Sequence, residues 1–100
     1  MDTIQNIQLI VTNPTIRGGR PCIAGTSLRV TDVVMATIFH DRQPGQIASD
    51  YSISLAQVHA ALAYYYEHKD ALDTDIRHQL ETAQMLKEKA LGSRKTSLLP

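Results

Sequence analysis

Apolar and polar residues alternate near the start of the chain, which is the pattern of an extended strand. Ile7, Leu9 and Val11 occupy every second position of the stretch TIQNIQLIVT, as expected for a strand with one buried face. The Asn13-Pro14 pair follows and is typical of a turn. The pattern therefore predicts a strand that ends in a turn.

Two further turns are expected before the first helix. The Gly18-Gly19 pair can adopt positive φ without steric cost, so IRGGRP predicts a tight turn. The stretch CIAGTSLRV then predicts two short extended pieces, around Ile23 and around residues 28–30, folded back at residues 24–26. Residues 1–30 are therefore expected to form a β-hairpin region.

Helical periodicity begins after these turns. Thr31 can cap a helix start, and Asp32 lies favourably against the positive end of the helix dipole. The sequence HDRQPG interrupts the helix, and a short helix within GQIASDY follows. Ser54 then caps a longer helix that runs to about His68. Residues 31–68 are expected to form a helical core.

The last third of the chain carries one apolar stripe. Its members recur at steps of three and four and are Leu72, Ile76, Leu80, Ala83, Leu86 and Ala90. They predict a C-terminal helix over residues 70–90, roughly 20 residues long. The polar segment 91–100 has no periodicity, so we expect a flexible tail. Residues 1–90 are expected to form a single domain with one modest core.

This stripe is also a candidate contact surface. A chain of 100 residues has little core left to cover it. The candidate partner-binding residues are Leu72, Ile76, Leu80 and Leu86. We therefore expect a homodimer or a larger homo-oligomer.

Residues 44–63 fit the spacing of a helix-turn-helix unit. The positions that such units use for their shared core are Ile47, Tyr51, Ile53, Val58 and Ala61. Ser52 stands at the turn position that usually holds glycine. Many three-helix proteins that do not bind DNA share this spacing, so DNA binding is a separate question.

Base recognition needs Arg, Lys, Asn or Gln side chains that reach the edges of bases. On the exposed face of the second helix of this unit, only Gln57 and His59 are candidates, and the helix carries no lysine or arginine. The alternative is a packing helix with a solvated outer face. On these residues alone, the sequence slightly favours that alternative.

Four arginines are candidates for contacts with DNA phosphates. Arg17, Arg20 and Arg29 lie in the hairpin region, and Arg42 follows the first helix. If the hairpin folds as expected, they can form a small basic patch. The alternative is that they are ordinary surface arginines, and the sequence leaves both open.

Composition narrows the class of protein. Ten basic and ten acidic side chains give zero formal charge, which weakens the case for a strong nucleic-acid binder without excluding one. The single cysteine, Cys22, excludes an internal disulfide and favours a reducing, cytoplasmic location. No apolar run approaches the roughly 20 residues that span a membrane. The N-terminus lacks the basic start and cleavage site of a signal peptide.

The sequence offers no set of residues for catalysis or for a cofactor. The four histidines, His40, His59, His68 and His78, lack metal-ligand spacing, and no Cys-x-x-Cys accompanies them. Cys22 has no nearby general base, so a small buried thiol is its expected role. No nucleophile, base and oxyanion donor come together. We expect neither a metal site nor an enzyme.

Several separated motifs follow one another over roughly residues 10–70. They are an Asn-Pro, a Gly-Arg-Pro, a Gly-Thr, an Ile-x-x-x-Tyr and an Ala-Leu-x-Tyr-Tyr-x-x-His. With Val30, their residues are Asn13, Pro14, Gly19, Arg20, Pro21, Gly25, Thr26, Val30, Ile47, Tyr51, Ala61, Leu62, Tyr64, Tyr65 and His68. In this order they resemble the domain-of-unknown-function 433 family. The family commonly has arginine after the Gly-Thr pair, whereas this chain has Ser27 there. A role of that arginine is therefore either lost or moved to Arg29.

The resemblance implies a mainly α fold with a homeodomain-like helix-turn-helix core of three helices, a short N-terminal hairpin region and a long C-terminal helix. Many members resemble the antitoxin of a toxin–antitoxin pair encoded beside a PIN-like ribonuclease. By that analogy the chain is a small dimer that binds operator DNA and blocks the nuclease with the segment after about Asp70. The alternative is a dimeric protein-interaction module that neither binds DNA nor catalyses a reaction.

Overall fold

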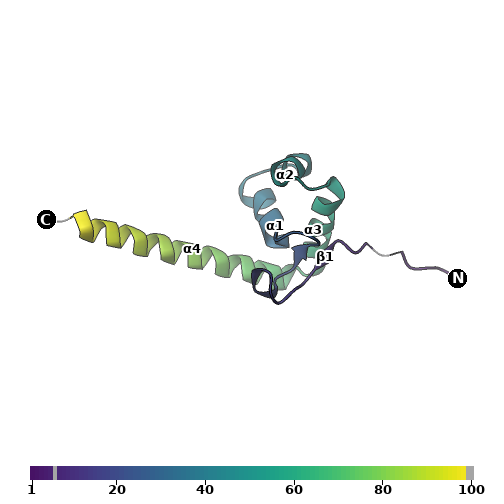
Figure 1. Ribbon diagram of the computed structural model, residues 1–100, viewed down its shortest axis with the longest axis horizontal. Coiled ribbons are helices and arrows are strands. Elements are labelled where there is room, and N and C mark those ends of the chain that lie inside the picture. The colour runs from purple at the N-terminus through teal and green to yellow at the C-terminus, as the bar shows by residue number, and fades with distance from the viewer. Residues whose placement is uncertain (6, 99–100) are drawn as a thin grey trace. The chain divides into compact units, whose positions relative to one another are not determined.

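The computed structural model describes residues 1–5 and 7–98, with side chains described as far as residue 90. A short two-stranded antiparallel hairpin precedes three helices, and a long fourth helix follows them (Figure 1). The expected mainly α fold is thereby confirmed. Contacts divide the chain into two compact units, Met1–Lys69 and Asp70–Pro100.

The hairpin is shorter than the sequence pattern predicts. Strand β1 (Ile10–Val11) pairs antiparallel with β2 (Cys22–Ile23). Leu9 lies just outside β1, but its carbonyl still accepts a hydrogen bond from the Ala24 N–H at 2.8 Å. Ile7 belongs to no strand and is 81% exposed. Only the last part of the predicted strand therefore finds a partner within one chain.

Both predicted turns are present. A 3₁₀ turn, η1 (Arg17–Gly19), separates the strands, and its two glycines have φ of 66° and 81°. The chain folds back again after β2, where the Thr26 N–H donates to the Ile23 carbonyl at 3.0 Å. The Ile23 N–H in turn donates to the Leu28 carbonyl at 2.9 Å. These turns hold residues 17–29 in a compact double loop.

Helix α1 (Val30–Phe39) begins two residues earlier than a cap at Thr31 predicts. Thr31 is not its cap but lies inside the helix and is 2% exposed. The cap position is Arg29, whose N–H donates to the Asp32 carboxylate at 2.9 Å. The N–H groups of Asp32 and Val33, to which a capping hydroxyl would be the usual acceptor, donate instead to the Arg29 carbonyl at 3.1 and 3.4 Å.

Helices α2 (Pro44–Tyr51) and α3 (Leu55–Glu67) are joined by a three-residue turn. Ser52 adopts the left-handed conformation, with φ 55° and ψ 45°, at the position predicted to replace glycine. Ser54 caps α3 as expected, because its hydroxyl accepts from the Gln57 N–H at 3.1 Å. The Gln57 side-chain oxygen accepts from the Ser54 N–H at 2.7 Å and completes a capping box.

The core forms where α1 and α2 pack against α3. Ile47, Val58 and Ala61 are fully buried, as predicted for the shared core. Ile53 is only half-buried. Tyr51 retains 43% of its exposed surface, so its predicted place in the core is wrong. It is the last residue of α2, and the chain turns away directly after it.

Helix α4 (Lys69–Leu98) continues past its predicted end near residue 90, because no proline interrupts it. Leu72 and Ile76 are 5% and 6% exposed, whereas Leu80 and Leu86 are 42% and 61% exposed. The side chains of residues 91–100 and the backbone of residues 99–100 lie outside the described part of the chain, so the flexibility of the tail 91–100 stays a prediction. In the part of the chain that is described, no helix is both long and apolar enough to span a bilayer.

Candidate nucleic-acid and partner interfaces

The outward face of α3 is largely apolar. His59 is exposed on it, together with Leu55 at 50% and Tyr66 at 71% exposure. These residues share one face because their spacing follows the helical repeat. Gln57 is half-buried, and its side-chain oxygen is occupied in the capping box. Only the amide nitrogen of Gln57 and the imidazole of His59 are therefore suited to contact bases.

Arg29 is bound by Asp32. Its Nη2 lies 2.7 Å from Asp32 Oδ1, and its Nε lies 3.2 Å from both carboxylate oxygens. The two side chains are only 17% and 20% exposed. Burial alone would raise the pKa of Asp32, but hydrogen bonds and charge from Arg29, with a smaller contribution from Arg17, hold that pKa below its ordinary value. Arg29 therefore anchors the start of α1.

Arg42 is bound by Asp50. Its Nη2 and Nε donate to Asp50 Oδ2 at 2.6 and 3.0 Å. These side chains are 38% and 46% exposed, so water screens the pair more than the one at α1. The pair ties the segment after α1 to α2 and neutralises the charge that a phosphate would need.

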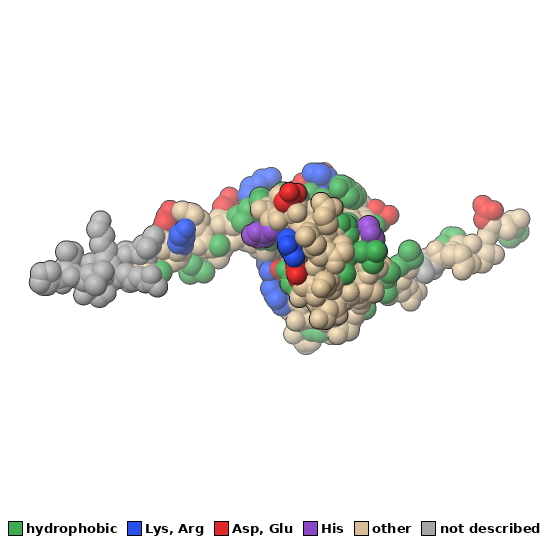
Figure 2. All heavy atoms as spheres, turned by 90° about the horizontal axis from the view of Figure 1, so that it is seen from above, with side chains coloured by type: hydrophobic (Ala, Val, Ile, Leu, Met, Phe, Trp, Pro, Cys, Tyr) green, Lys and Arg blue, Asp and Glu red, His purple; other side chains and the backbone are tan. Residues whose placement is uncertain are grey.

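Arg17 and Arg20 lie exposed at the turn between the strands. The Arg20 Nη1 donates weakly to the Arg17 carbonyl at 3.4 Å, and the Arg17 charge acts on both Asp32 and Cys22. The hairpin thus brings Arg17 and Arg29 to the same carboxylate. On the face shown in Figure 2, the cationic side chains form separate small groups, and some lie next to acidic ones.

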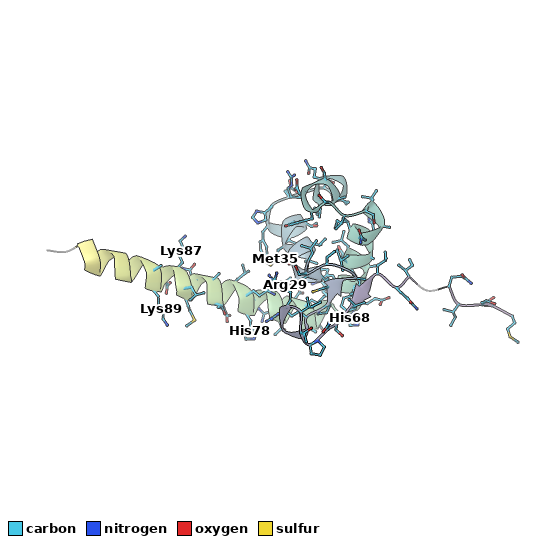
Figure 3. All side chains as sticks on the ribbon, viewed as in Figure 1. Arg29, Met35, His68, His78, Lys87 and Lys89 are labelled. Carbon is cyan, nitrogen blue, oxygen red and sulfur yellow. The ribbon has the colours of Figure 1, made fainter. Side chains whose placement is uncertain are left out.

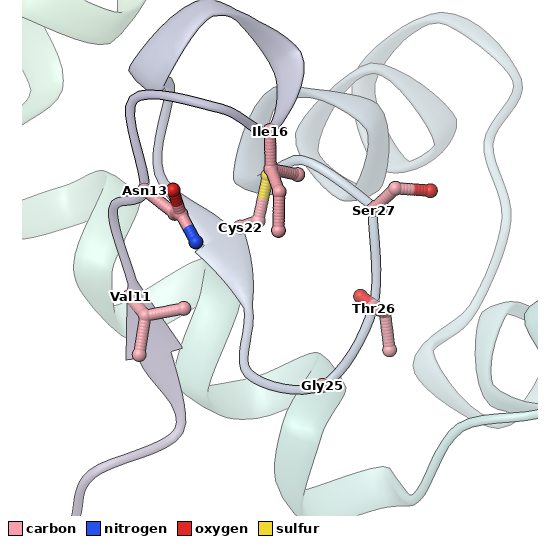
Figure 4. Close-up of a pocket in the computed structure, with 7 residues that line it drawn as sticks. All are labelled: Val11, Asn13, Ile16, Cys22, Gly25, Thr26 and Ser27. Atoms are coloured by element: carbon pink, nitrogen blue, oxygen red, sulfur yellow. The ribbon is translucent and has the colours of Figure 1, made fainter.

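The double loop encloses a hollow of about 470 Å³ (Figure 4). The Asn13 Oδ1 accepts from the backbone N–H and the hydroxyl of Thr15 at 3.0 and 2.8 Å. In Figure 4 its amide nitrogen points toward the hollow. The Thr26 hydroxyl donates to the Ile23 carbonyl at 2.8 Å and accepts from the Leu28 N–H at 3.0 Å. These hydrogen bonds stabilise the turns, so the main role of Asn13 and Thr26 is structural.

Cys22 and Ser27 also line this hollow. The Cys22 thiol is 3% exposed and donates to the Arg20 carbonyl at 3.4 Å. Burial raises the pKa of this thiol, so it is a packed side chain rather than a nucleophile. Ser27 is exposed, and Arg29 is engaged at α1. Arg29 is therefore not a freely available substitute for an arginine at position 27.

The exposed stripe of α4 begins where the buried residues end. Leu80 and Leu86 lie on the predicted apolar face, whereas Met85, 59% exposed, lies on the opposite face. Lys87 and Lys89 point to different sides of the helix (Figure 3). The C-terminal half of α4 therefore offers an apolar strip with cationic neighbours.

The sequence did not lead to a prediction of the two carboxylates that bind arginines, Asp32 and Asp50. Asp32 follows Arg29 at a spacing of three at a helix start, a signal that was present in the sequence. Asp50 is eight residues from Arg42, so the pair does not follow from the spacings of three and four that bring side chains together on one helix. Among the described residues, no group of three or more His, Cys, Asp or Glu side chains is placed to hold a metal ion.

Comparison with known proteins identifies a family for this chain. The family model described as "Protein of unknown function (DUF433)" matches residues 10–65, which is more than half of the chain. No curated protein and no solved structure matches the chain significantly. The matched region contains the hairpin and helices α1 and α2, and it ends within α3.

Proposed function

This chain belongs to the DUF433 family, and on that premise we propose that it is an antitoxin-like regulator that binds DNA and restrains a PIN-like ribonuclease. The observation that carries the proposal is the α2–turn–α3 arrangement. It combines a short helix, a tight turn at Ser52 and a capped second helix. Helix-turn-helix proteins use this arrangement to present the second helix to the major groove.

In this proposal the DNA contacts divide between two elements. Arg17 and Arg20, which are both exposed at the hairpin turn, bind phosphates. His59 and the Gln57 amide nitrogen contact base edges. Arg29 and Arg42 act indirectly, since each is held by an aspartate that positions a helix.

The inhibitory segment in this proposal is the exposed part of α4. An amphipathic helix that lies in an apolar groove uses side chains at steps of three and four as anchors. Leu80 and Leu86 supply such anchors, and Lys87, which borders the same face of the helix, suits an acidic rim on the nuclease.

A mobility-shift titration with the DNA upstream of the gene tests the DNA half. Binding should weaken with salt, and Arg17→Ala and Arg20→Ala should each reduce the log–log slope by about 0.9. Arg77→Ala removes the same charge from an exposed position on α4 and is the matched control. If the wild-type protein gives no shift at low salt, DNA binding is excluded.

A second candidate function is a dimeric protein-interaction module without DNA binding. The apolar outer face of α3, with Leu55 and Tyr66 exposed and no lysine or arginine, favours it. Tyrosine and leucine at the centre of an exposed patch are typical of protein contacts. Inhibition of a neighbouring nuclease without any mobility shift is the result that distinguishes this function from the first.

A further inference from the structure

The two-stranded sheet has one open edge. On one side β2 pairs with β1, and on its other side Cys22 pairs with Arg29. Strand β1 has a partner on one side only. The Leu9 carbonyl accepts from Ala24, so by the alternation of an antiparallel ladder Gln8 and Ile10 direct their N–H and C=O groups away from β2.

This edge lacks the features that keep edge strands from pairing. Natural edges carry charged side chains, proline or a covering element. The segment Ile7–Thr12, IQLIVT, has no charged residue and no proline. Ile7 is 81% and Val11 44% exposed. Among the described residues, none accepts a hydrogen bond from the outward N–H groups of Gln8 and Ile10.

The strand that the sequence predicts is also longer than the part that pairs within one chain. The alternation of Ile7, Leu9 and Val11 predicts a strand with one apolar face, yet pairing within the chain is confined to the region of β1. A second strand along the open edge would extend the pairing and place its own apolar side chains beside those of that face. The missing element must be extended, uncharged and apolar on the same face.

We propose that β1 is a homodimer interface, in which the Ile7–Thr12 segments of two copies pair antiparallel about a two-fold axis at Leu9. In this register Leu9 lies opposite Leu9 of the second copy, and Ile7 lies opposite its Val11. The outward groups of Gln8 exchange hydrogen bonds with those of Ile10 in the second copy. The two copies together form a four-stranded sheet.

The register follows from the exposed side chains. It brings the two most exposed aliphatic residues of the segment, Ile7 and Val11, into contact across the axis. A register centred on Ile10 would instead place Ile7 opposite Asn13. Because the segment is uncharged, a second copy approaches without like-charge repulsion. The interface lies outside the proposed DNA and nuclease contacts and stands independently of them.

Cysteine cross-linking tests the register. In a Cys22→Ser background, the serine hydroxyl can replace the thiol that donates to Arg20. Leu9→Cys should form a disulfide-linked dimer, because directly opposite residues in a non-hydrogen-bonded pair have Cα atoms about 4.5 Å apart. Ile7→Cys and Val11→Cys should each fail alone, because the two copies of the same cysteine then lie about 14 Å apart, four positions at about 3.4 Å. A mixture of the two should cross-link.

Light scattering with a matched pair of variants tests the interface. The wild type should have twice the chain mass of 11.1 kDa. Gln8→Pro removes an N–H that faces away from β2, so it should weaken dimerisation at least tenfold. Its unfolding midpoint should match that of the wild type at concentrations where both are monomeric. Gln8→Ala keeps that N–H and should remain dimeric.

Three results would overturn the proposal. They are a monomeric wild type at tens of micromolar, a fully dimeric Gln8→Pro variant, and an Ile7→Cys variant that cross-links alone as fast as the mixture. A monomer that still shifts DNA overturns the interface and leaves the proposed function standing. A dimer that does not shift DNA leaves the interface standing and overturns the DNA-binding half of the proposed function.

Discussion

The start of α1 depends on one carboxylate, and Asp32→Asn tests how strongly. The carboxylate accepts the Arg29 N–H at 2.9 Å and binds the guanidinium at 2.7 and 3.2 Å. Asparagine keeps the shape of the side chain but has one carbonyl oxygen and no charge. It can accept from the backbone or from the guanidinium, but it cannot repeat the full set of contacts.

The expected loss is larger than that of a surface ion pair. A hydrogen bond to a charged group contributes about 1.5–3 kcal/mol when buried, and a helix N-cap contact about 0.5–2 kcal/mol. Both side chains retain some exposure, 17% and 20%, so we take the lower part of these ranges. Asp32→Asn should lower the free energy of unfolding by about 1.5 kcal/mol, roughly 6–12 °C in Tm for a domain of this size.

Urea unfolding followed by circular dichroism measures this loss, and Asp50→Asn is the matched control. It makes the same change in a pair that is 38% and 46% exposed, so it should cost less than about 1 kcal/mol. If Asp32→Asn costs no more than Asp50→Asn, the Arg29 contact does not stabilise α1 as argued.

The pH dependence gives a second check. The pKa of Asp32 is held below its ordinary value of 3.8, so its contribution is present above that value and is lost as pH falls through the folded-state pKa. The difference between wild type and Asp32→Asn should therefore shrink in acid. A difference that stays constant from neutral pH to strong acid would contradict the assignment.

Three further outcomes are expected. Ser52→Gly should raise the free energy of unfolding by about 0.5–1 kcal/mol in urea titrations, because glycine adopts the left-handed conformation without the Cβ clash. Leu86→Asp should abolish inhibition of the neighbouring nuclease without shifting the unfolding midpoint, whereas Met85→Asp on the opposite face should retain inhibition. Ile76→Asp should instead destabilise the fold, because Ile76 is 6% exposed. The Cys22 thiol should react with a disulfide reagent at least tenfold more slowly in the folded than in the urea-unfolded protein, since burial raises its pKa.

Features set by local chemistry were predictable from the sequence. The two glycines of η1, the serine cap of α3 and the unusual Ser52 turn each depend on backbone preferences of a few adjacent residues. The buried positions Ile47 and Val58 followed from the spacing of apolar residues. The turns and the cap are encoded within about one helical turn, and the buried positions within the short unit of residues 44–63.

Features that depend on distant packing were not predictable. Thr31 has the chemistry of a cap, but packing buries it, and the Arg29–Asp32 contact starts the helix instead. Helical periodicity placed Leu72 and Leu86 on the same stripe, yet only Leu72 is buried. Periodicity identifies a face of a helix, and it does not say which residues of that face are buried.

The aspartates that bind Arg29 and Arg42 also limit the affinity expected for DNA, because they reduce the number of phosphate contacts. With Arg29 and Arg42 bound to aspartates, the hairpin turn offers Arg17 and Arg20. Two phosphate contacts per chain predict a log–log salt slope of about 2 for a monomer and about 4 for a dimer. Specific DNA-binding proteins commonly make 6–10 such contacts. A measured slope near 4 would therefore mean that dimerisation is what makes DNA binding possible, whereas a slope near 8 would mean that cations outside the hairpin, such as Lys87 and Lys89, also contact DNA.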